Sequence, residues 1–319
     1  MIPAVIRPLG KTSSIGAATD TSAVTTNCLK QRKARLGLMG LLLVGTLSVA
    51  AISAVAPVHA QGKNFKVAAD VGLVPFFMQS ASGQMEGFSF DFAQSLAKRM
   101  GYDDIDVIDT PFSAIFAGLF SGRYETVAGP VNITQERAQQ MLYTEPYMAG
   151  GLSFLTKKGS VVATLDDLKG KTIAVNNGSF SDKWLQDNQA KYGYEIQRFN
   201  KNNDAVQAVA IGRAFANLSE TPLARWIAKQ TPTLVTAYDH KTGSNYGLVF
   251  RKEDTELRNK VERQIECMKT DGSLAKLHVK WFGSEPDAGS SMTHVYPGYG
   301  VPDMPGYDPT EHALDCAKP

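Results

Sequence analysis

The stretch GPVNITQERAQQMLYTEPY, residues 129–147, is the most informative part of this chain, because it places one arginine just inside an apparent helix start. Thr134 can accept a hydrogen bond from the first free N–H groups of that helix, and Arg137 then lies in its first turn. A guanidinium held there, near free backbone donors and the positive end of the helix dipole, can grip a small carboxylate with two parallel hydrogen bonds. A lone arginine is more often a solvated surface residue, so the rest of the chain must support this interpretation.

The first 60 residues are typical of an export signal. Four Lys or Arg at positions 30–35 precede an uncharged run over residues 36–55, and Val58-His59-Ala60 supplies the small residues of a cleavage site. The run is long enough to remain as a membrane anchor, but its Val-His-Ala ending favours cleavage after Ala60. We therefore expect a signal peptide over residues 1–60 and a periplasmic protein.

Removal of the leader changes the sign of the net charge. The leader holds six Lys or Arg and one Asp, so the formal charge of +2 for the whole chain becomes about −3 for the mature part. This balance argues against nucleic acid as a partner. About 259 residues remain, which is enough for two lobes with separate cores.

Cysteine usage also fits export. Cys28 leaves with the leader, and the two cysteines that remain, Cys267 and Cys316, are expected to pair as a disulfide in an oxidising compartment. Because no pair of histidines lies near them, they would make a poor zinc site. We expect neither a metal nor a cofactor.

Predicted strands alternate with predicted helices along the mature chain. The strands fall at 65–69, 105–108, 172–175, 196–199, 214–218 and 247–250, and the helices at 87–101, 113–120, 181–189, 203–211 and 255–270. Residues 129–134 are predicted as a loop, and residues 284–319, rich in Pro, Gly, Tyr and Asp, as a surface tail. The alternation predicts an α/β fold with parallel-rich sheets, whose ligands lie at the carboxyl ends of the strands.

Six segments within residues 65–283 occur in the order of a known family. They are GFSFDFAQSLAKRMG, TPFSAIFAGLFSGRYE, AGPVNITQERAQQMLYTEPY, DDLKGKTIAVNNGSFSDKWL, AVQAVAIGRAFANLSETPLARW and ECMKTDGSLAKLHVKWFG. Together they resemble the family 3 periplasmic solute-binding proteins, which deliver polar amino acids to ABC importers.

The resemblance implies a type II periplasmic binding protein fold of two α/β lobes. Lobe 1 would comprise residues 61–153 and 247–283, lobe 2 residues 154–246, and the tail residues 284–319. Two crossing strands, near 151–156 and 246–250, would join the lobes, which close on a ligand by a hinge motion. The implied partners are an amino acid or related small carboxylate and a membrane ABC permease, and we expect a monomer.

Residue by residue, the resemblance assigns the ends of an amino acid to the cleft. Arg137 matches the arginine that holds the α-carboxylate, and Asn132 lies where a Ser or Thr contacts the same zwitterion. Glu220 lies where the family has an aspartate for the α-ammonium; alternatively it caps the following helix. Asp70 matches an acid that faces the ligand side chain in many relatives, although it could equally cap the loop that follows.

Several positions depart from the family pattern. Pro130 replaces a Gly or Ser, and in the anion loop of lobe 2, which contains Ser179, Phe180 replaces a Thr. Leu73 stands where a stacking Tyr or Phe is common. An apolar box would be formed by Leu73, Phe76, Phe112 and Phe180, although each of these is individually more often a core residue.

Three functions are compatible with these residues. The first is transport, with charge clamps on both lobes and no catalytic residue. The second is dehydration of a prephenate-like acid, in which Glu220 would act as general acid. The third is an accessory role for a periplasmic dehydrogenase, with docking through the tail. No Ser-His-Asp or Cys-His set is evident, and we expect a transport protein that is not an enzyme.

Overall fold

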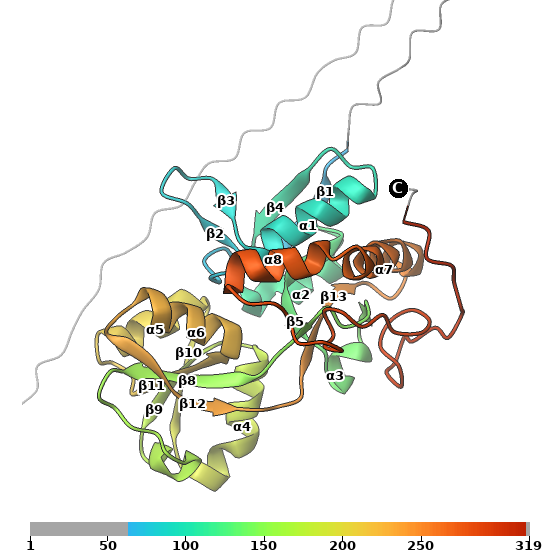
Figure 1. Ribbon diagram of the computed structural model, residues 1–319. Coiled ribbons are helices and arrows are strands. Elements are labelled where there is room, and N and C mark those ends of the chain that lie inside the picture. Colours follow the sequence, from blue (N-terminus) through green and yellow to red (C-terminus); the bar gives the residue numbers. More distant parts are fainter. Residues whose placement is uncertain (1–62, 317–319) are drawn as a thin grey trace, which may run out of the picture. The chain divides into compact units, whose positions relative to one another are not determined.

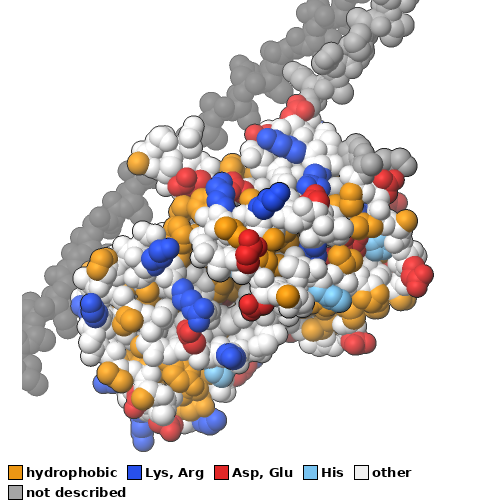
Figure 2. All heavy atoms as spheres, in the orientation of Figure 1, with side chains coloured by type: hydrophobic (Ala, Val, Ile, Leu, Met, Phe, Trp, Pro, Cys, Tyr) orange, Lys and Arg blue, Asp and Glu red, His pale blue; other side chains and the backbone are white. Residues whose placement is uncertain are grey.

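The computed structural model describes residues 63–316, and the signal peptide expected over residues 1–60 lies outside them. Two mixed β-sheets with helices around them make up this part of the chain, which confirms the α/β class (Figure 1). Within residues 63–316, no helix is both long and apolar enough to cross a membrane. On the face drawn in Figure 2, basic and acidic side chains are interspersed, without an extended basic surface.

The first sheet has the strand order β4-β1-β5-β13-β6, and β7 also pairs with β13. Its strands are β1 (Phe65–Ala69), β4 (Ile105–Asp109), β5 (Thr126–Asn132), β6 (Leu142–Tyr143), β7 (Met148–Ala149) and β13 (Asn245–Phe250). Strand β1 lies parallel to β4 and β5, whereas β13 runs antiparallel to β5 with Tyr246 opposite Asn132. The helices of this lobe are α1 (Phe88–Arg99), α2 (Phe112–Phe120), α3 (Gln135–Ala138), α7 (Thr255–Thr270) and α8 (Ser273–Phe282). Strands β2 (Met78–Gln79) and β3 (Met85–Glu86) form a separate hairpin.

The second sheet has the order β10-β9-β11-β8-β12. Its strands are β8 (Leu152–Lys157), β9 (Thr172–Asn176), β10 (Glu195–Phe199), β11 (Ala216–Glu220) and β12 (Leu234–His240). Strands β10, β9 and β11 are parallel, and β8 runs antiparallel to both β11 and β12. The helical elements of this lobe are the short 3-10 helix over Leu165–Leu168, α4 (Phe180–Tyr192), α5 (Asn202–Ala210) and α6 (Thr221–Gln230).

Helix α1 shows why the sequence forms these elements. Phe92 and Leu96 recur at helical spacing and are fully buried in the core of the first lobe. Burial of each such side chain contributes about 1.5–3 kcal/mol, so the apolar face fixes how the helix packs. Gly101 follows the helix with a φ of 87°, a conformation that glycine adopts without steric cost.

The chain passes between the sheets at residues 150–151 and 241–244, which corrects the expected crossing strands. Strand β8 belongs wholly to the second sheet and β13 wholly to the first. As judged by strand pairing, lobe 2 therefore comprises residues 152–240, whereas residues 154–246 were expected. The two crossing segments contact each other, since Gly150 N donates to Ser244 O at 2.7 Å.

The segment expected as a loop at residues 129–134 is a strand as far as Asn132. Its partner β13 comes from more than 100 residues later, so no local pattern could reveal the pairing. Pro130 is accommodated because the register between β5 and β13 shifts between Gly247 and Val249, and proline in sheets is confined to edges and bulges. Helix α6 and strand β12 were also not predicted.

Candidate ligand-binding cleft

The carboxyl ends of the parallel strands of the two sheets face each other across the lobes. Asn132 ends β5 in the first sheet and donates from Nδ2 to Glu220 Oε1, at the end of β11, at 3.4 Å. Asn176, at the end of β9, donates from Nδ2 to Asp70 Oδ2, just after β1, at 3.3 Å. These contacts place a cleft where open α/β sheets bind their ligands.

Arg137 lies at one end of this cleft. The Oγ1 of Thr134 accepts a hydrogen bond from Arg137 N at 3.2 Å, so the predicted cap is confirmed, although α3 is only four residues long. The guanidinium donates from Nη1 to Asn132 O and from Nη2 to Gly178 O of the second lobe, both at 3.2 Å. Since a guanidinium carries five N–H donors, these two bonds leave capacity for an incoming acceptor.

Two aromatic rings fix the plane of this guanidinium. The Cζ of Arg137 lies 5.6 Å from the ring centroid of Phe112 and 5.2 Å from that of Phe116. Cation–π contacts of this kind contribute about 0.5–1 kcal/mol at exposed sites. Both rings belong to the same lobe as Arg137 and support its side chain there, and Phe116 is a supporting residue that the sequence analysis did not single out.

Glu220 lies between the second sheet and α6. It occupies the N-cap position of α6, but its side chain makes no capping hydrogen bond, so the capping alternative is not observed. Burial raises the pKa of its carboxyl, and Arg137 and Asn132 act in the opposite direction. A partly buried carboxylate of this kind is suited to pair with a cation.

A small cavity of about 20 Å³ lies beside Glu220, and neither Arg137 nor Asn132 is among its lining residues. It is lined by Leu73, Phe112, Pro130, Asn176, Ser179, Ser181, Asn202, Leu218, Ser219 and Glu220. The volume suits about one water molecule, so an amino acid would need the lobes to move apart. Five residues expected in the site, Leu73, Phe112, Pro130, Ser179 and Glu220, are brought together here.

The remaining members of the expected apolar box lie elsewhere. Phe180 lines a wider hollow of about 320 Å³ together with Arg137, and Ser179 borders both hollows. Phe76 is fully buried in the core of the first lobe and packs against Phe88 and Tyr246, which corrects its assignment to the ligand site. Its sequence position close to Leu73 did not reveal that its ring turns into the core.

Sequence reasoning missed Asn176, Ser181 and Asn202, which carry unpaired polar atoms at the cavity. Asn176 Oδ1, Ser181 Oγ and both amide atoms of Asn202 are buried and have no hydrogen-bond partner among residues 63–316. Asn132 Oδ1 is likewise buried without a hydrogen-bond partner in this part of the chain. Buried polar atoms are nearly always paired in native proteins, so this cluster marks a place for a ligand or water. The position of Asn176 at the end of a predicted strand was the signal available.

Asp70 is paired within the chain. It is almost fully buried, and Lys201 Nζ lies 3.8 Å from its Oδ1 and 2.9 Å from Asp109 Oδ2. Burial raises the pKa of Asp70 to about 6, although Lys201 and Asn176 lower it. Asp70 borders the cleft through Asn176 and does not itself line the cavity.

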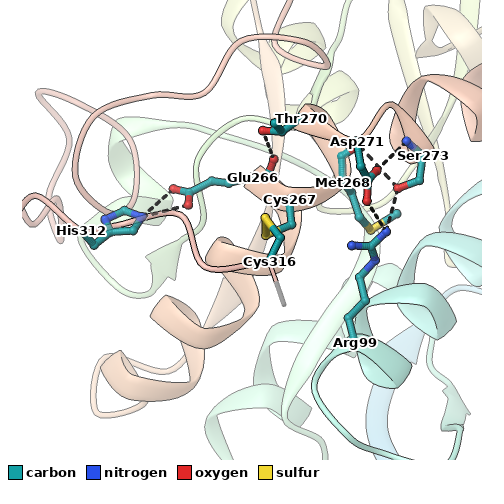
Figure 3. Close-up of a disulfide and its surroundings, with 9 residues drawn as sticks. All are labelled: Arg99, Glu266, Cys267, Met268, Thr270, Asp271, Ser273, His312 and Cys316. Atoms are coloured by element: carbon teal, nitrogen blue, oxygen red, sulfur yellow. Dashed lines mark hydrogen bonds and ion pairs between the residues drawn. A yellow bond between two sulfur atoms is a disulfide. The ribbon is translucent and has the colours of Figure 1, made fainter. Parts of the chain in front are cut away.

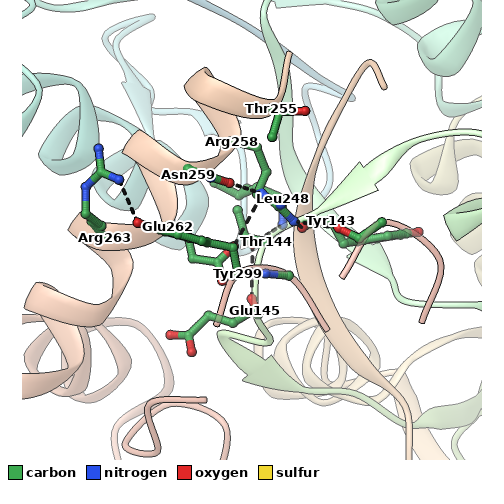
Figure 4. Close-up of polar contacts among 12 residues, drawn as sticks. Tyr143, Thr144, Glu145, Leu248, Thr255, Arg258, Asn259, Glu262, Arg263 and Tyr299 are labelled. Carbon is green, nitrogen blue, oxygen red and sulfur yellow. Dashed lines mark hydrogen bonds and ion pairs between the residues drawn. The ribbon is translucent and has the colours of Figure 1, made fainter. Parts of the chain in front are cut away.

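The tail is joined to α7 by the predicted disulfide between Cys267 and Cys316, which is confirmed (Figure 3). Beneath the tail lie three buried glutamates, and each has a partner from the tail. Gly300 N donates to Glu262 at 2.6 Å and Tyr296 N donates to Glu145 at 2.8 Å. Both of these glutamates are labelled in Figure 4. His312 lies 2.8 Å from Glu266 (Figure 3).

Cations of the first lobe lie among the same glutamates. Lys269 Nζ lies 2.7 Å from Glu145, and Arg258 Nε lies 3.9 Å from Glu262. Arg258 also donates to the tail at Gly306 O. The segment expected as a surface tail therefore also completes the hydrogen bonding of buried ionisable groups, which are costly to leave unpaired.

Comparison with known proteins agrees with this architecture. A model of the family described as bacterial extracellular solute-binding proteins, family 3, matches residues 65–284. The L-cystine-binding protein TcyJ of Escherichia coli (strain K12) is 30% identical over 260 residues, covering 80% of this chain and 96% of that protein.

Two solved structures are similar in sequence and fold. An ancestral arginine-binding protein bound to arginine is 30% identical, with a TM-score of 0.66, and covers 70% of this chain and all of its own. The ancestral amino acid-binding protein AncCDT-1, a precursor of cyclohexadienyl dehydratase, is 31% identical with a TM-score of 0.64 and covers 69% of this chain and 95% of its own. The chain belongs to the bacterial extracellular solute-binding proteins of family 3.

Proposed function

We propose that this protein is the periplasmic binding component of an ABC importer, and that it binds an amino acid or related small carboxylate between its lobes. One observation carries the proposal. A cation from one lobe, Arg137, and an anion from the other, Glu220, meet at Asn132, which contacts both. Opposite charges that share Asn132 as a neighbour are complementary in sign to the two charged ends of an amino acid. The relatives named for cystine and arginine binding support the same class of ligand.

Arg137 would receive the α-carboxylate. Its bond to Gly178 O of the second lobe is to a neutral carbonyl, and a carboxylate is the stronger acceptor for a guanidinium. An arriving carboxylate would therefore displace Gly178 O and take the two-pronged geometry. Phe112 and Phe116 would keep the guanidinium in plane during this exchange.

Glu220 would receive the α-ammonium, with help from neutral acceptors. Asn132 Oδ1 is buried without a partner, and the carbonyl of Pro130 can accept even though proline has no N–H to donate. An ammonium beside Glu220 would favour the ionised carboxylate and so lower the pKa of Glu220, which burial raises. Each charge of the ligand would then be paired inside the closed cleft.

Opening and closing would occur at residues 150–151 and 241–244. A Cβ at Gly150 would lie 2.7 Å from Ser244 Oγ, so a larger residue there would require the side chain of Ser244 to shift. Hinges are a few residues that absorb the change in backbone angles between rigid lobes. The small cavity and the contacts between the lobes describe a closed arrangement, which a hinge of this kind would open.

We further propose that residues 1–60 are removed on export and that the mature protein acts as a monomer with a membrane permease. The uncharged run over residues 36–55 and the Val-His-Ala ending support cleavage. The disulfide between Cys267 and Cys316 is in keeping with an oxidising compartment.

Native mass spectrometry of the exported protein, followed by calorimetry with the copurified molecule, tests this function. We expect one small molecule per chain with a carboxylate, and micromolar or tighter binding after the protein has been stripped and refolded. The raised pKa of Glu220 would also suit a general acid, so a hydroxylated cyclohexadienyl acid is included as a second substrate. Steady turnover of that acid, without binding of any amino acid, would contradict transport.

A further inference from the structure

Beyond Glu220, the two sheets face each other strand by strand. In the first sheet the neighbouring strands β5, β1 and β4 end in this cleft, and in the second sheet β11, β9 and β10 do so. The facing pairs, in order, are Asn132 with Glu220, Asp70 with Asn176, and Asp109 with Lys201. If the first pair holds the charged end of an amino acid, the second and third pairs lie where its side chain would extend.

The third pair is an acidic corner that already contains a cation. Lys201 Nζ lies 2.9 and 3.0 Å from the two carboxylate oxygens of Asp109, and 3.8 Å from Asp70 Oδ1. It also donates to Val71 O at 3.4 Å. Lys201 thus crosses from the second lobe into the first, and a second cation in this corner would meet like charge at short range.

Neutral polar atoms lie between this corner and Glu220. Asn176 and Asn202 both line the cavity, and Asn176 Oδ1 and both amide atoms of Asn202 are buried without partners among residues 63–316. An amide offers donors and an acceptor, so the pair suits a group that has both, such as a carboxamide or a hydroxyl. Among the residues that line the cavity, only Glu220 is charged. The α-ammonium of the ligand would pair with Glu220, so the ligand side chain would meet only neutral groups in this cavity.

On the basis of the proposed function, we propose that this cleft selects amino acids with an uncharged, hydrogen-bonding side chain. Lys201 excludes cationic side chains because it occupies the corner between Asp70 and Asp109.

Calorimetry with L-glutamine, L-arginine and L-leucine tests the assignment on the mature protein and on Lys201→Met. We expect the wild type to bind glutamine at least tenfold more tightly than arginine or leucine. Lys201→Met should raise the ratio of arginine to glutamine affinity at least tenfold, because it removes the ammonium that pairs with Asp109 and lies beside Asp70. Lys171→Met is the matched control, because Lys171 lies just before the first residue of β9, whereas Asn176 at the cavity is the last residue of that strand. This variant should leave the affinities for arginine and glutamine unchanged.

The ratio of arginine to glutamine affinity is the decisive quantity, because loss of an ion pair between the lobes alters closure for every ligand alike. A wild type that prefers arginine or leucine, or a ratio that is the same in Lys201→Met, would overturn the selectivity assignment and leave the transport function standing. Failure to bind any amino acid would instead refute the proposed function. Circular dichroism checks folding, and Lys201→Gln replaces the methionine variant if that variant does not fold.

Discussion

Replacement of Arg137 by alanine tests the charge arrangement on which the binding site depends. The side chain is fixed by two hydrogen bonds to carbonyls and by two aromatic rings, and we propose that it exchanges one carbonyl for the ligand carboxylate. Loss of one partner from a buried, charge-assisted fork costs about 2–5 kcal/mol. Because 1.4 kcal/mol corresponds to about tenfold in affinity, we expect a loss between about 30-fold and several thousand-fold.

The same change should affect folding much less. Removal of the side chain loses two cation–π contacts of about 0.5–1 kcal/mol each, so the free energy of unfolding should fall by about 1–2 kcal/mol. The two carbonyls that it releases can accept hydrogen bonds from water instead. Arg137→Lys should lie between wild type and alanine in affinity, because an ammonium keeps the charge and loses the fork.

The assay is calorimetric titration of the cognate amino acid into wild type, both variants and Arg123→Ala. Arg123 is an exposed arginine of the same lobe and serves as the matched control. Arg123→Ala should bind as wild type does. If Arg137→Ala binds within threefold of wild type, Arg137 does not hold the carboxylate and the arrangement that we propose is refuted.

Three further predictions concern Glu220, the disulfide and the glutamates beneath the tail. Glu220→Gln should weaken binding of an amino acid far more than of its des-amino analogue in the same titration, and equal losses would make Glu220 structural. Reduction of Cys267–Cys316 should lower the melting temperature by several degrees and leave ligand affinity nearly unchanged; a large loss of affinity would mean that the tail reaches the cleft. Burial raises the pKa of Glu262 to about 8, so the folded state binds more protons than the unfolded state between about pH 4.5 and 8, and stability from this group falls as pH rises through that window. Glu262→Gln should flatten the fall in denaturation experiments across those pH values, and an unchanged slope would count against this origin.

Local patterns were sufficient for much of the fold. The spacing of Phe92 and Leu96 predicted α1, and Thr134 predicted the cap at Arg137, because both signals depend on neighbours within a few residues. The second half of β5, residues 129–132, differs from the predicted loop because its partner β13 is distant in sequence and because Pro130 normally marks a break.

The site was predictable only in part, for the same reason. Arg137 and Glu220 could be named from motifs, and the structure brings them to one cleft through Asn132. Asn202 and Lys201 carry no motif, and their place opposite the first sheet depends on how the two lobes meet. Phe76 was misplaced because composition does not tell a pocket phenylalanine from a core one.

A crystal structure of the exported protein with its copurified ligand is the most direct test of the central claim. We predict an amino acid between the lobes, with its carboxylate bonded to Arg137 in place of Gly178 O and its ammonium within about 3 Å of Glu220. A ligand bound outside this cleft, or a bound ligand with Arg137 still bonded to Gly178 O and Glu220 without a cationic partner, would contradict the claim.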